Sequence, residues 1–163
     1  MEKFEIERKF LIAMPDLQWL SGKAVRRLGM VQTYLLAADG ESSRVRKITE
    51  NGTVTYIQTM KKRISNIKRL ETEAEITAEE YATLLEKADP ARRPIRKVRY
   101  CVPYGRHMLE IDIFSFWQDK AFLEVELADE KEEITLPSEF LVLREVTEDR
   151  RYTNAALAKE LPE

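Results

Sequence analysis

Charged and apolar residues alternate along several segments of this chain, and the sign of the charge is sorted segment by segment. A period of two places the charged side chains on one face of a β-strand and the apolar side chains on the other. Four segments each carry two charges of one sign: Arg44 and Arg46, Lys97 and Arg99, Glu110 and Asp112, Glu124 and Glu126. Because neighbouring like charges repel, a face that only meets water would more often mix signs. The charged faces therefore indicate a bound partner of opposite charge.

The alternating segments predict about eight or nine strands. They cover residues 3–12, 31–36, 43–48, 53–61, 67–76, 95–102, 108–114, 122–128 and 141–146. An open antiparallel sheet with one face in water is the simpler alternative. Closing the sheet into a small barrel removes exposed edges and suits this number of strands. We predict an α+β fold, mainly antiparallel β: an eight-stranded closed barrel, or tunnel, with a charged interior and helices packed outside.

Helices are predicted between the strands. Thr77 is a favourable N-cap residue, and Glu80 three positions later completes a capping box for a helix that ends near residue 88. Shorter helices are predicted over 15–20, 137–140 and 154–161. Their apolar residues would cover the outside of the sheet.

Composition restricts the class of protein. A chain of 163 residues with 44% hydrophobic content can form one core, so residues 1–163 are expected to be a single domain. The formal charge of −2 provides no global basic field for nucleic acid or an anionic membrane. The lone Cys101 has no disulfide partner, and no apolar signal segment follows Met1, so a cytoplasmic location is expected.

A barrel interior lined with charges is costly unless the charges are paired or bind ions. Carboxylates are oxygen ligands for Mg²⁺ or Mn²⁺, and Mg²⁺ usually combines one or two of them with waters and substrate phosphates. Arginine and lysine are the matching phosphate ligands. A cavity that contains both sets is suited to a metal-bridged polyphosphate.

The segment Glu5-Ile6-Glu7-Arg8-Lys9 resembles the ExExK signature of the CYTH superfamily, the triphosphate tunnel metalloenzymes. Further segments resemble motifs of the same family, in order: Arg44/Arg46 (RxR), Thr59/Lys61 (TxK), Arg69/Glu71/Glu73 (RxExE), Lys97/Arg99 (KxR), Glu110/Asp112 (ExD) and Glu124/Glu126 (ExE). Residues from Glu145 through Tyr152 and Asn154 resemble the closing segment of short bacterial inorganic triphosphatases. The connection from Lys61 to Arg69 departs from the pattern, because it carries additional basic residues and lacks the glycine often found there.

The resemblance implies a role for each charged residue. Metal binding by Mg²⁺ or Mn²⁺ is assigned to Glu5, Glu7, Glu124 and Glu126. Phosphate binding is assigned to Lys9, Arg44, Arg46, Lys61, Arg69, Lys97 and Arg99, with Glu5, Glu7, Lys9 and Lys61 as catalytic residues. Further acidic lining comes from Glu71, Glu73, Glu110 and Asp112, of which the first three could instead pair with basic neighbours. Tyr34 is not assigned to the site.

The expected activity is metal-dependent hydrolysis of inorganic tripolyphosphate to pyrophosphate and phosphate. Thiamine or nucleoside triphosphate hydrolysis, ATP cyclisation, and a non-catalytic polyphosphate-binding module are the alternatives. No Walker A loop or HExxH motif supports a different chemistry. The expected partner is a small triphosphate, without nucleic acid or membrane, and the sequence leaves open whether the protein is a monomer or a homodimer.

Overall fold

The computed structural model describes residues 2–162, which form nine strands, three α-helices and one 3₁₀ helix. The strands are β1 (Glu2–Ala13), β2 (Arg26–Leu35), β3 (Glu41–Glu50), β4 (Thr53–Arg63), β5 (Lys68–Ile76), β6 (Ile95–Tyr104), β7 (His107–Phe114), β8 (Lys120–Glu126) and β9 (Val142–Glu145). The helices are α1 (Leu17–Lys23), α2 (Ala78–Leu85), α3 (Asn154–Lys159) and the 3₁₀ helix η1 (Arg150–Tyr152). Within residues 2–162, no helix has the length and apolar character needed to cross a membrane.

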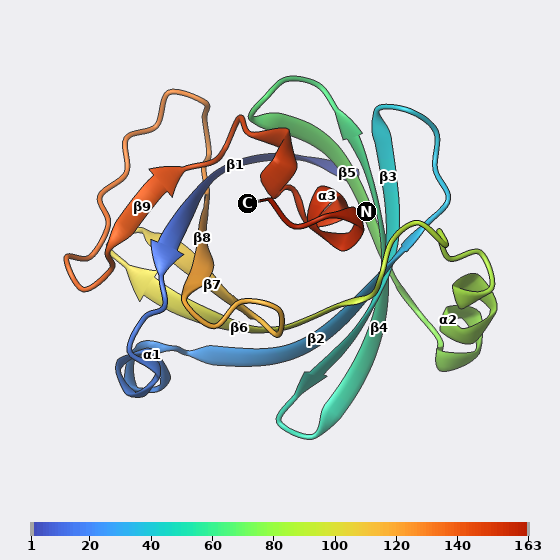
Figure 1. Ribbon diagram of the computed structural model, residues 1–163, viewed down its shortest axis with the longest axis horizontal. Helices are drawn as coiled ribbons and strands as arrows, with labels where there is room; N and C mark the ends of the chain where they lie inside the picture. Colours follow the sequence, from blue (N-terminus) through green and yellow to red (C-terminus); the bar gives the residue numbers. More distant parts are fainter. Residues whose placement is uncertain (1, 163) are drawn as a thin grey trace.

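Strand β1 closes the sheet into a barrel because each half of it pairs with a different strand. Its first half is antiparallel to β5, and its second half is antiparallel to β8. The other strands complete the ring in the order β5-β4-β3-β2-β6-β7-β8, with antiparallel pairing throughout (Figure 1). The predicted eight-stranded closed barrel is confirmed. A ninth strand, β9, pairs with the second half of β1.

The outer face of the barrel carries an apolar cluster over β1, β6, β7 and β8, as the alternation predicts. Phe10 and Ile12 of β1 belong to a buried cluster with residues of β6, β7 and β8. Leu20 of α1 and Phe140 cover this cluster, and the Phe140 ring packs edge-on against Trp19 with 5.3 Å between ring centroids. These contacts hold α1 and the segment after β8 against the outside of the wall.

The inner face is charged only in its middle layer, whereas the sequence pattern predicts a charged interior throughout. On β1 the inward series of Glu5, Glu7 and Lys9 continues with Leu11, which packs in an apolar cluster with Phe122 and residues of three other strands. A second apolar cluster contains Leu28, Met30, Ile48 and Cys101, whose positions continue the inward series of β2, β3 and β6. The charged layer therefore lies between two apolar layers.

The helices differ in their position relative to the barrel. Helices α1 and α2 lie outside the ring of strands, as predicted, whereas η1 and α3 lie within its outline (Figure 1). Leu157 and Ala158 of α3 join the inward apolar cluster around Leu11, so this helix closes one end of the barrel. The prediction that all helices pack outside is thus wrong for α3.

Two further helix predictions had different outcomes. The Thr77 capping box is confirmed, because the Glu80 amide donates to the Thr77 hydroxyl at 3.0 Å and the Thr77 amide donates to the Glu80 carboxylate at 3.1 Å. The predicted helix over 137–140 is wrong. That segment forms a turn in which the Phe140 amide donates to the Pro137 carbonyl at 3.3 Å, too few residues for a helix to propagate.

Candidate active site

A cavity of about 420 Å³ lies inside the charged layer of the barrel. Most of its lining residues are charged and come from strands on opposite sides of the ring. Of the residues that the sequence predicts for the site, this lining includes Glu5, Glu7, Lys9, Arg44, Lys61, Arg69, Arg99, Glu110 and Glu124. The cavity therefore brings together basic and acidic motifs that are up to 119 positions apart, as Glu5 and Glu124 show.

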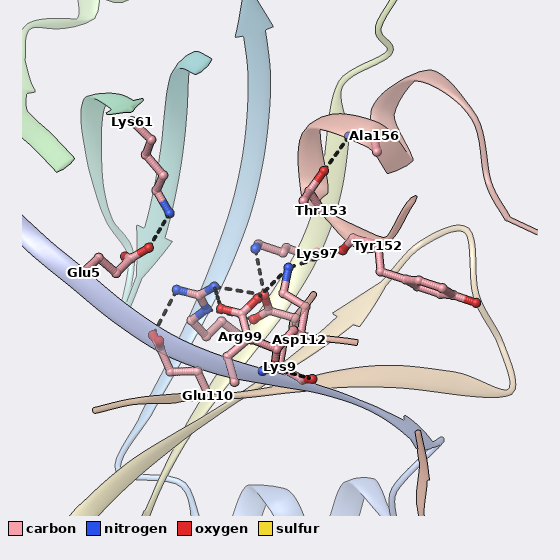
Figure 2. Close-up of polar contacts among 12 residues, drawn as sticks. Glu5, Lys9, Lys61, Lys97, Arg99, Glu110, Asp112, Tyr152, Thr153 and Ala156 are labelled. Atoms are coloured by element: carbon pink, nitrogen blue, oxygen red, sulfur yellow. Dashed lines mark hydrogen bonds and ion pairs between the residues drawn. The ribbon is translucent and has the colours of Figure 1, made fainter. Parts of the chain in front are cut away.

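On one side of the cavity, charges of opposite sign neutralise one another across β6 and β7. We call Lys97, Arg99, Glu110 and Asp112 the paired wall. Arg99 binds Asp112 in a bidentate manner, with distances of 2.7 Å from Nε to Oδ1 and 2.9 Å from Nη2 to Oδ2. Its Nη1 donates to Glu110 at 2.9 Å, and Lys97 Nζ donates to Asp112 at 2.7 Å (Figure 2). The side chains of Lys97 and Asp112 are both 0% exposed.

The electrostatics of the paired wall follow from this geometry. Burial alone would raise the pKa of Asp112, but the Arg99 guanidinium and the Lys97 ammonium outweigh it and hold that pKa well below its usual range. For Lys97, burial is the larger effect and lowers the pKa to about 8 despite the nearby Asp112 carboxylate. The Lys97 ammonium lies behind the cavity lining, and its predicted role in phosphate binding stays a prediction.

The opposite side of the cavity leaves more of its charge without a partner. We call Glu5 and Glu7 of β1, Arg44 and Arg46 of β3, and Lys61 of β4 the open wall. Lys61 Nζ donates to Glu5 at 2.8 Å (Figure 2). The same atom lies 3.5 Å from Glu71. Although burial opposes it, the Lys61 ammonium lowers the pKa of Glu5 well below its usual range. Glu71 is itself buried, and burial together with its contact to Glu5 raises its pKa to about 7.

Glu7 is the carboxylate with the least compensation. Within residues 2–162 it forms no ion pair. Burial, followed by the negative charges of Glu124 and Glu5, raises the pKa of Glu7 to about 7. The negative charges of Glu5 and Glu124 thus act on Glu7, which favours a cation near it.

Arg44 and Arg46 carry the corresponding surplus of positive charge. Both Nε atoms are buried without a hydrogen-bond partner among the described residues. One Nη atom of Arg46 donates to Glu73 at 3.2 Å and to Thr59 at 3.4 Å. Burial, then repulsion by Arg44 and Arg99, lowers the pKa of Arg46 to about 9. Arg44 lines the cavity, whereas Arg46 lies behind its lining. Because an unpaired buried donor is costly, the Arg44 guanidinium favours an anion in the cavity.

A model of the CYTH domain family matches residues 3–151. The chain belongs to the CYTH domain family. An inorganic triphosphatase from Nitrosomonas europaea is 34% identical to this chain in an alignment of 164 residues. The alignment covers 97% of this chain and 99% of that protein. The crystal structure of the inorganic triphosphatase NE1496 is 31% identical in sequence and superposes with a TM-score of 0.61. The match covers 98% of this chain and 97% of the NE1496 chain. The PH1819 protein from Pyrococcus horikoshii, 22% identical with a TM-score of 0.61, shares the fold over 78% of this chain and 80% of its own.

The carboxylates of this CYTH domain fit a hard divalent cation by their chemistry. No group of three or more potential ligand side chains is already assembled around a point within residues 2–162. Instead, Glu5 contacts Lys61, and Glu124 lies 3.4 Å from the Lys9 ammonium. Glu7, whose pKa is raised by burial and then by the negative charges of Glu124 and Glu5, forms no ion pair among the described residues, and carboxylate oxygens are the donors that Mg²⁺ and Mn²⁺ prefer.

Other predicted residues lie at the edge of the site or behind its lining. Glu126 is at the rim, where its side chain is 55% exposed and lies 3.9 Å from Lys3. Glu73 is bound by Arg46 outside the cavity lining. Their assigned roles stay predictions.

The sequence pattern misses several residues that line the cavity of this CYTH domain: Tyr34, Glu41, Ser42, Arg63, Arg92, Arg150, Thr153, Asn154 and Ala155. Arg63 continues the inward series of Thr59 and Lys61, so the alternation could have identified it. Arg92 and Arg150 lie outside the strands, where no periodicity indicates a direction. The C-terminal segment reaches the site because the Lys9 ammonium donates to the Tyr152 carbonyl at 3.3 Å (Figure 2).

Proposed function

We propose that this protein hydrolyses inorganic tripolyphosphate to pyrophosphate and phosphate in a reaction that depends on a divalent metal ion. The observation that carries the proposal is that Arg44, whose buried Nε has no acceptor among the described residues, and Glu7, which forms no ion pair among them, line one cavity. A metal-bridged polyphosphate satisfies both groups at once. The 34% identity to an inorganic triphosphatase over nearly the whole chain supports the same conclusion.

The basic residues would bind and orient the phosphate chain. Arg44 lines the cavity and its Nε has no acceptor among the described residues, and Arg fits phosphate oxygens with a planar fork; Arg46 would add positive charge from behind the lining. Lys61 projects toward the acidic residues of β1, which places one cation between the phosphate groups and the metal ligands. Fixed donors of this kind stabilise the charge that spreads over the transferred phosphoryl group.

Glu5, Glu7 and Glu124 would hold Mg²⁺ or Mn²⁺, with Glu126 at the rim as a further ligand. The bound ion supplies neutralisation of phosphate charge and activation of water. In the reaction a water oxygen forms a bond to the terminal phosphorus, and the bond from that phosphorus to the bridging oxygen breaks, which releases pyrophosphate. A carboxylate of the cavity lining would accept the proton of the water.

The lining favours an inorganic substrate over an organic triphosphate. Tyr34 is the one aromatic residue among the described residues that line the cavity. A nucleobase or thiazolium ring would be expected to stack on an aromatic surface, and one tyrosine beside Arg44 offers little of it. We place the activity in the cytoplasm, where reducing conditions suit the free, buried Cys101.

The test is phosphate release from tripolyphosphate, pyrophosphate, ATP and thiamine triphosphate, each with Mg²⁺, Mn²⁺ or EDTA. We expect metal-dependent cleavage with tripolyphosphate as the best substrate. Preference for ATP or thiamine triphosphate would instead assign an organic triphosphatase, and a cyclic nucleotide product would assign a cyclase. Binding of tripolyphosphate without cleavage in any metal would reject the enzyme in favour of a binding module.

A further inference from the structure

Gln32 is a fully buried polar residue on the inner face of β2, and it belongs to neither wall of the cavity. It shares that face with Tyr34, which lines the cavity, and is itself 0% exposed. Neither its Oε1 nor its Nε2 atom has a hydrogen-bond partner among the described residues. A buried amide without partners is costly and rare in native proteins, so this position requires an explanation.

Another unpaired polar atom belongs to the residue beside Gln32. In the antiparallel register of β2 and β3, Gln32 is directly opposite Arg46. The Cβ atoms of such opposite residues are about 4.5 to 5.5 Å apart, so the two side chains are neighbours on the inner face. The Nε atom of Arg46 is buried and has no acceptor within the described part of the chain. An unpaired acceptor and an unpaired donor thus lie on neighbouring residues without bonding to each other.

Arg46 is instead bound by partners on the strands beyond β3. One of its Nη atoms donates to Glu73 of β5 at 3.2 Å and to Thr59 of β4 at 3.4 Å. Both partners lie outside the cavity lining. The Glu73 side chain is 38% exposed, so water can replace the guanidinium there at small cost. Arg46 is therefore held behind the lining by an ion pair that it can exchange for another anion.

A phosphate in the cavity would offer Arg46 a stronger partner. Arg44, which lines the cavity, is two residues from Arg46 on the same face of β3, a displacement of about 7 Å along the strand. An extended arginine side chain spans that distance, and its planar fork fits phosphate oxygens. When the two Nη atoms extend to the cavity, the Nε atom, which is closer to the backbone, stays beside the opposite residue, Gln32.

We propose that Gln32 is a positioning residue for phosphate binding: its Oε1 atom accepts a hydrogen bond from Arg46 Nε when the guanidinium leaves Glu73 for a phosphate in the cavity. This bond fixes the plane of the guanidinium, so that both Nη atoms are directed at the phosphate oxygens. In the empty barrel the amide stays unpaired, and its desolvation opposes folding. The inference rests on the proposed function, because it takes the cavity as a phosphate site.

The test variant is Gln32→Met, which keeps the length of the side chain and removes the amide. Calorimetric titration of the full-length protein with inorganic tripolyphosphate in EDTA should show an affinity about tenfold lower, as expected for the loss of one charge-assisted hydrogen bond. The midpoint of urea denaturation in EDTA should be equal or higher, because an apolar group replaces an unpaired buried amide. Thr33→Val is the matched control: it removes a buried hydroxyl from the outer face of the same strand and should leave the affinity unchanged.

A double-mutant cycle tests whether Gln32 acts through Arg46. In an Arg46→Gln background the guanidinium that Gln32 positions is absent. Adding Gln32→Met to that background should therefore cause no further loss of affinity for tripolyphosphate. A residue that only supports the fold would lower the affinity in both backgrounds.

Three results would overturn the positioning role. They are an unchanged affinity in Gln32→Met, a loss that persists in the Arg46→Gln background, and a urea midpoint that falls by more than in Thr33→Val, which would mean that the amide is already paired in the empty protein. Phosphate release with Mg²⁺ tests the proposed function separately. A wild-type protein that binds tripolyphosphate as expected but cleaves nothing would reject the hydrolase and keep the role of Gln32. Cleavage with an unchanged KM in Gln32→Met would keep the hydrolase and reject that role.

Discussion

The paired wall and the open wall use the same residue types for different purposes. In the paired wall, Asp112 accepts hydrogen bonds from both Lys97 and Arg99, so the charges are neutralised within the protein. In the open wall, the Nε atoms of Arg44 and Arg46 have no acceptor among the described residues. The two walls face each other across one barrel. Their difference separates charges that stabilise the barrel from charges that are available to a ligand.

This difference has a physical basis in desolvation. A charge removed from water is tolerated when an opposite charge and sufficient hydrogen bonds replace the water. The paired wall meets this condition without a ligand, whereas the open wall meets it only when metal and phosphate are bound. Substitutions in the first wall should therefore change folding, and substitutions in the second should change catalysis.

The largest effect is expected from Asp112→Asn in the paired wall. The substitution leaves two buried cations with a neutral partner, and breaking a buried pair in this way costs about 3 to 5 kcal/mol of unfolding free energy. Urea denaturation in EDTA measures it. Glu110→Gln is the matched control on the same strand, because its side chain is 30% exposed and water can replace its contact with Arg99. Equal costs for the two variants would contradict the structural role of the paired wall.

Glu7→Gln in the open wall should affect activity and not stability. The glutamine keeps the shape of the side chain but removes a charged metal ligand, so we expect a loss of about a hundred- to a thousandfold in kcat with Mg²⁺. In EDTA the free energy of unfolding should be equal or higher, because repulsion with Glu124 and Glu5 is relieved. Phosphate release and urea denaturation measure the two quantities. A variant that keeps full activity, or that unfolds as easily as Asp112→Asn, would contradict the division between the walls.

Arg44→Gln should weaken substrate capture by a smaller amount. Its guanidinium lines the cavity and its Nε has no acceptor, so its removal is expected to raise KM for tripolyphosphate about tenfold. Lys47→Gln is the control on the same strand, where the side chain is exposed on the opposite face. Steady-state kinetics over a wide range of substrate concentrations measure both variants. An unchanged KM and kcat in Arg44→Gln would remove this residue from the phosphate site.

The alternation of charge was sufficient to predict the barrel, because the direction of a side chain in a strand depends only on its parity. It could not predict the two apolar layers, since Leu11 and Phe122 share a parity with charged residues and an apolar residue is compatible with either face. Arg150 could not be predicted because its position depends on the path of the C-terminal segment. The RxR and KxR motifs look equivalent in sequence. Only the cross-strand register shows that Arg99 is opposite Asp112, whereas Arg46 is opposite Ile57.

The smallest effect is expected at an ion pair of β1 that lies on the outer face. Arg8 binds Glu145 of β9 through two hydrogen bonds of 2.9 and 2.6 Å, but the Glu145 side chain is 38% exposed. Solvent screening reduces the value of such a pair, so Glu145→Gln should cost less than about 1 kcal/mol of unfolding free energy at neutral pH.

The hydrogen bond from Arg8 lowers the pKa of Glu145. An acid with a lowered pKa stabilises the fold above its unfolded pKa of about 4.3, and that contribution is lost as the pH falls through the folded value. The difference between wild type and variant, measured by urea denaturation, should therefore shrink below about pH 4. A cost comparable to that of Asp112→Asn would show that burial is not what distinguishes the ion pairs of this barrel.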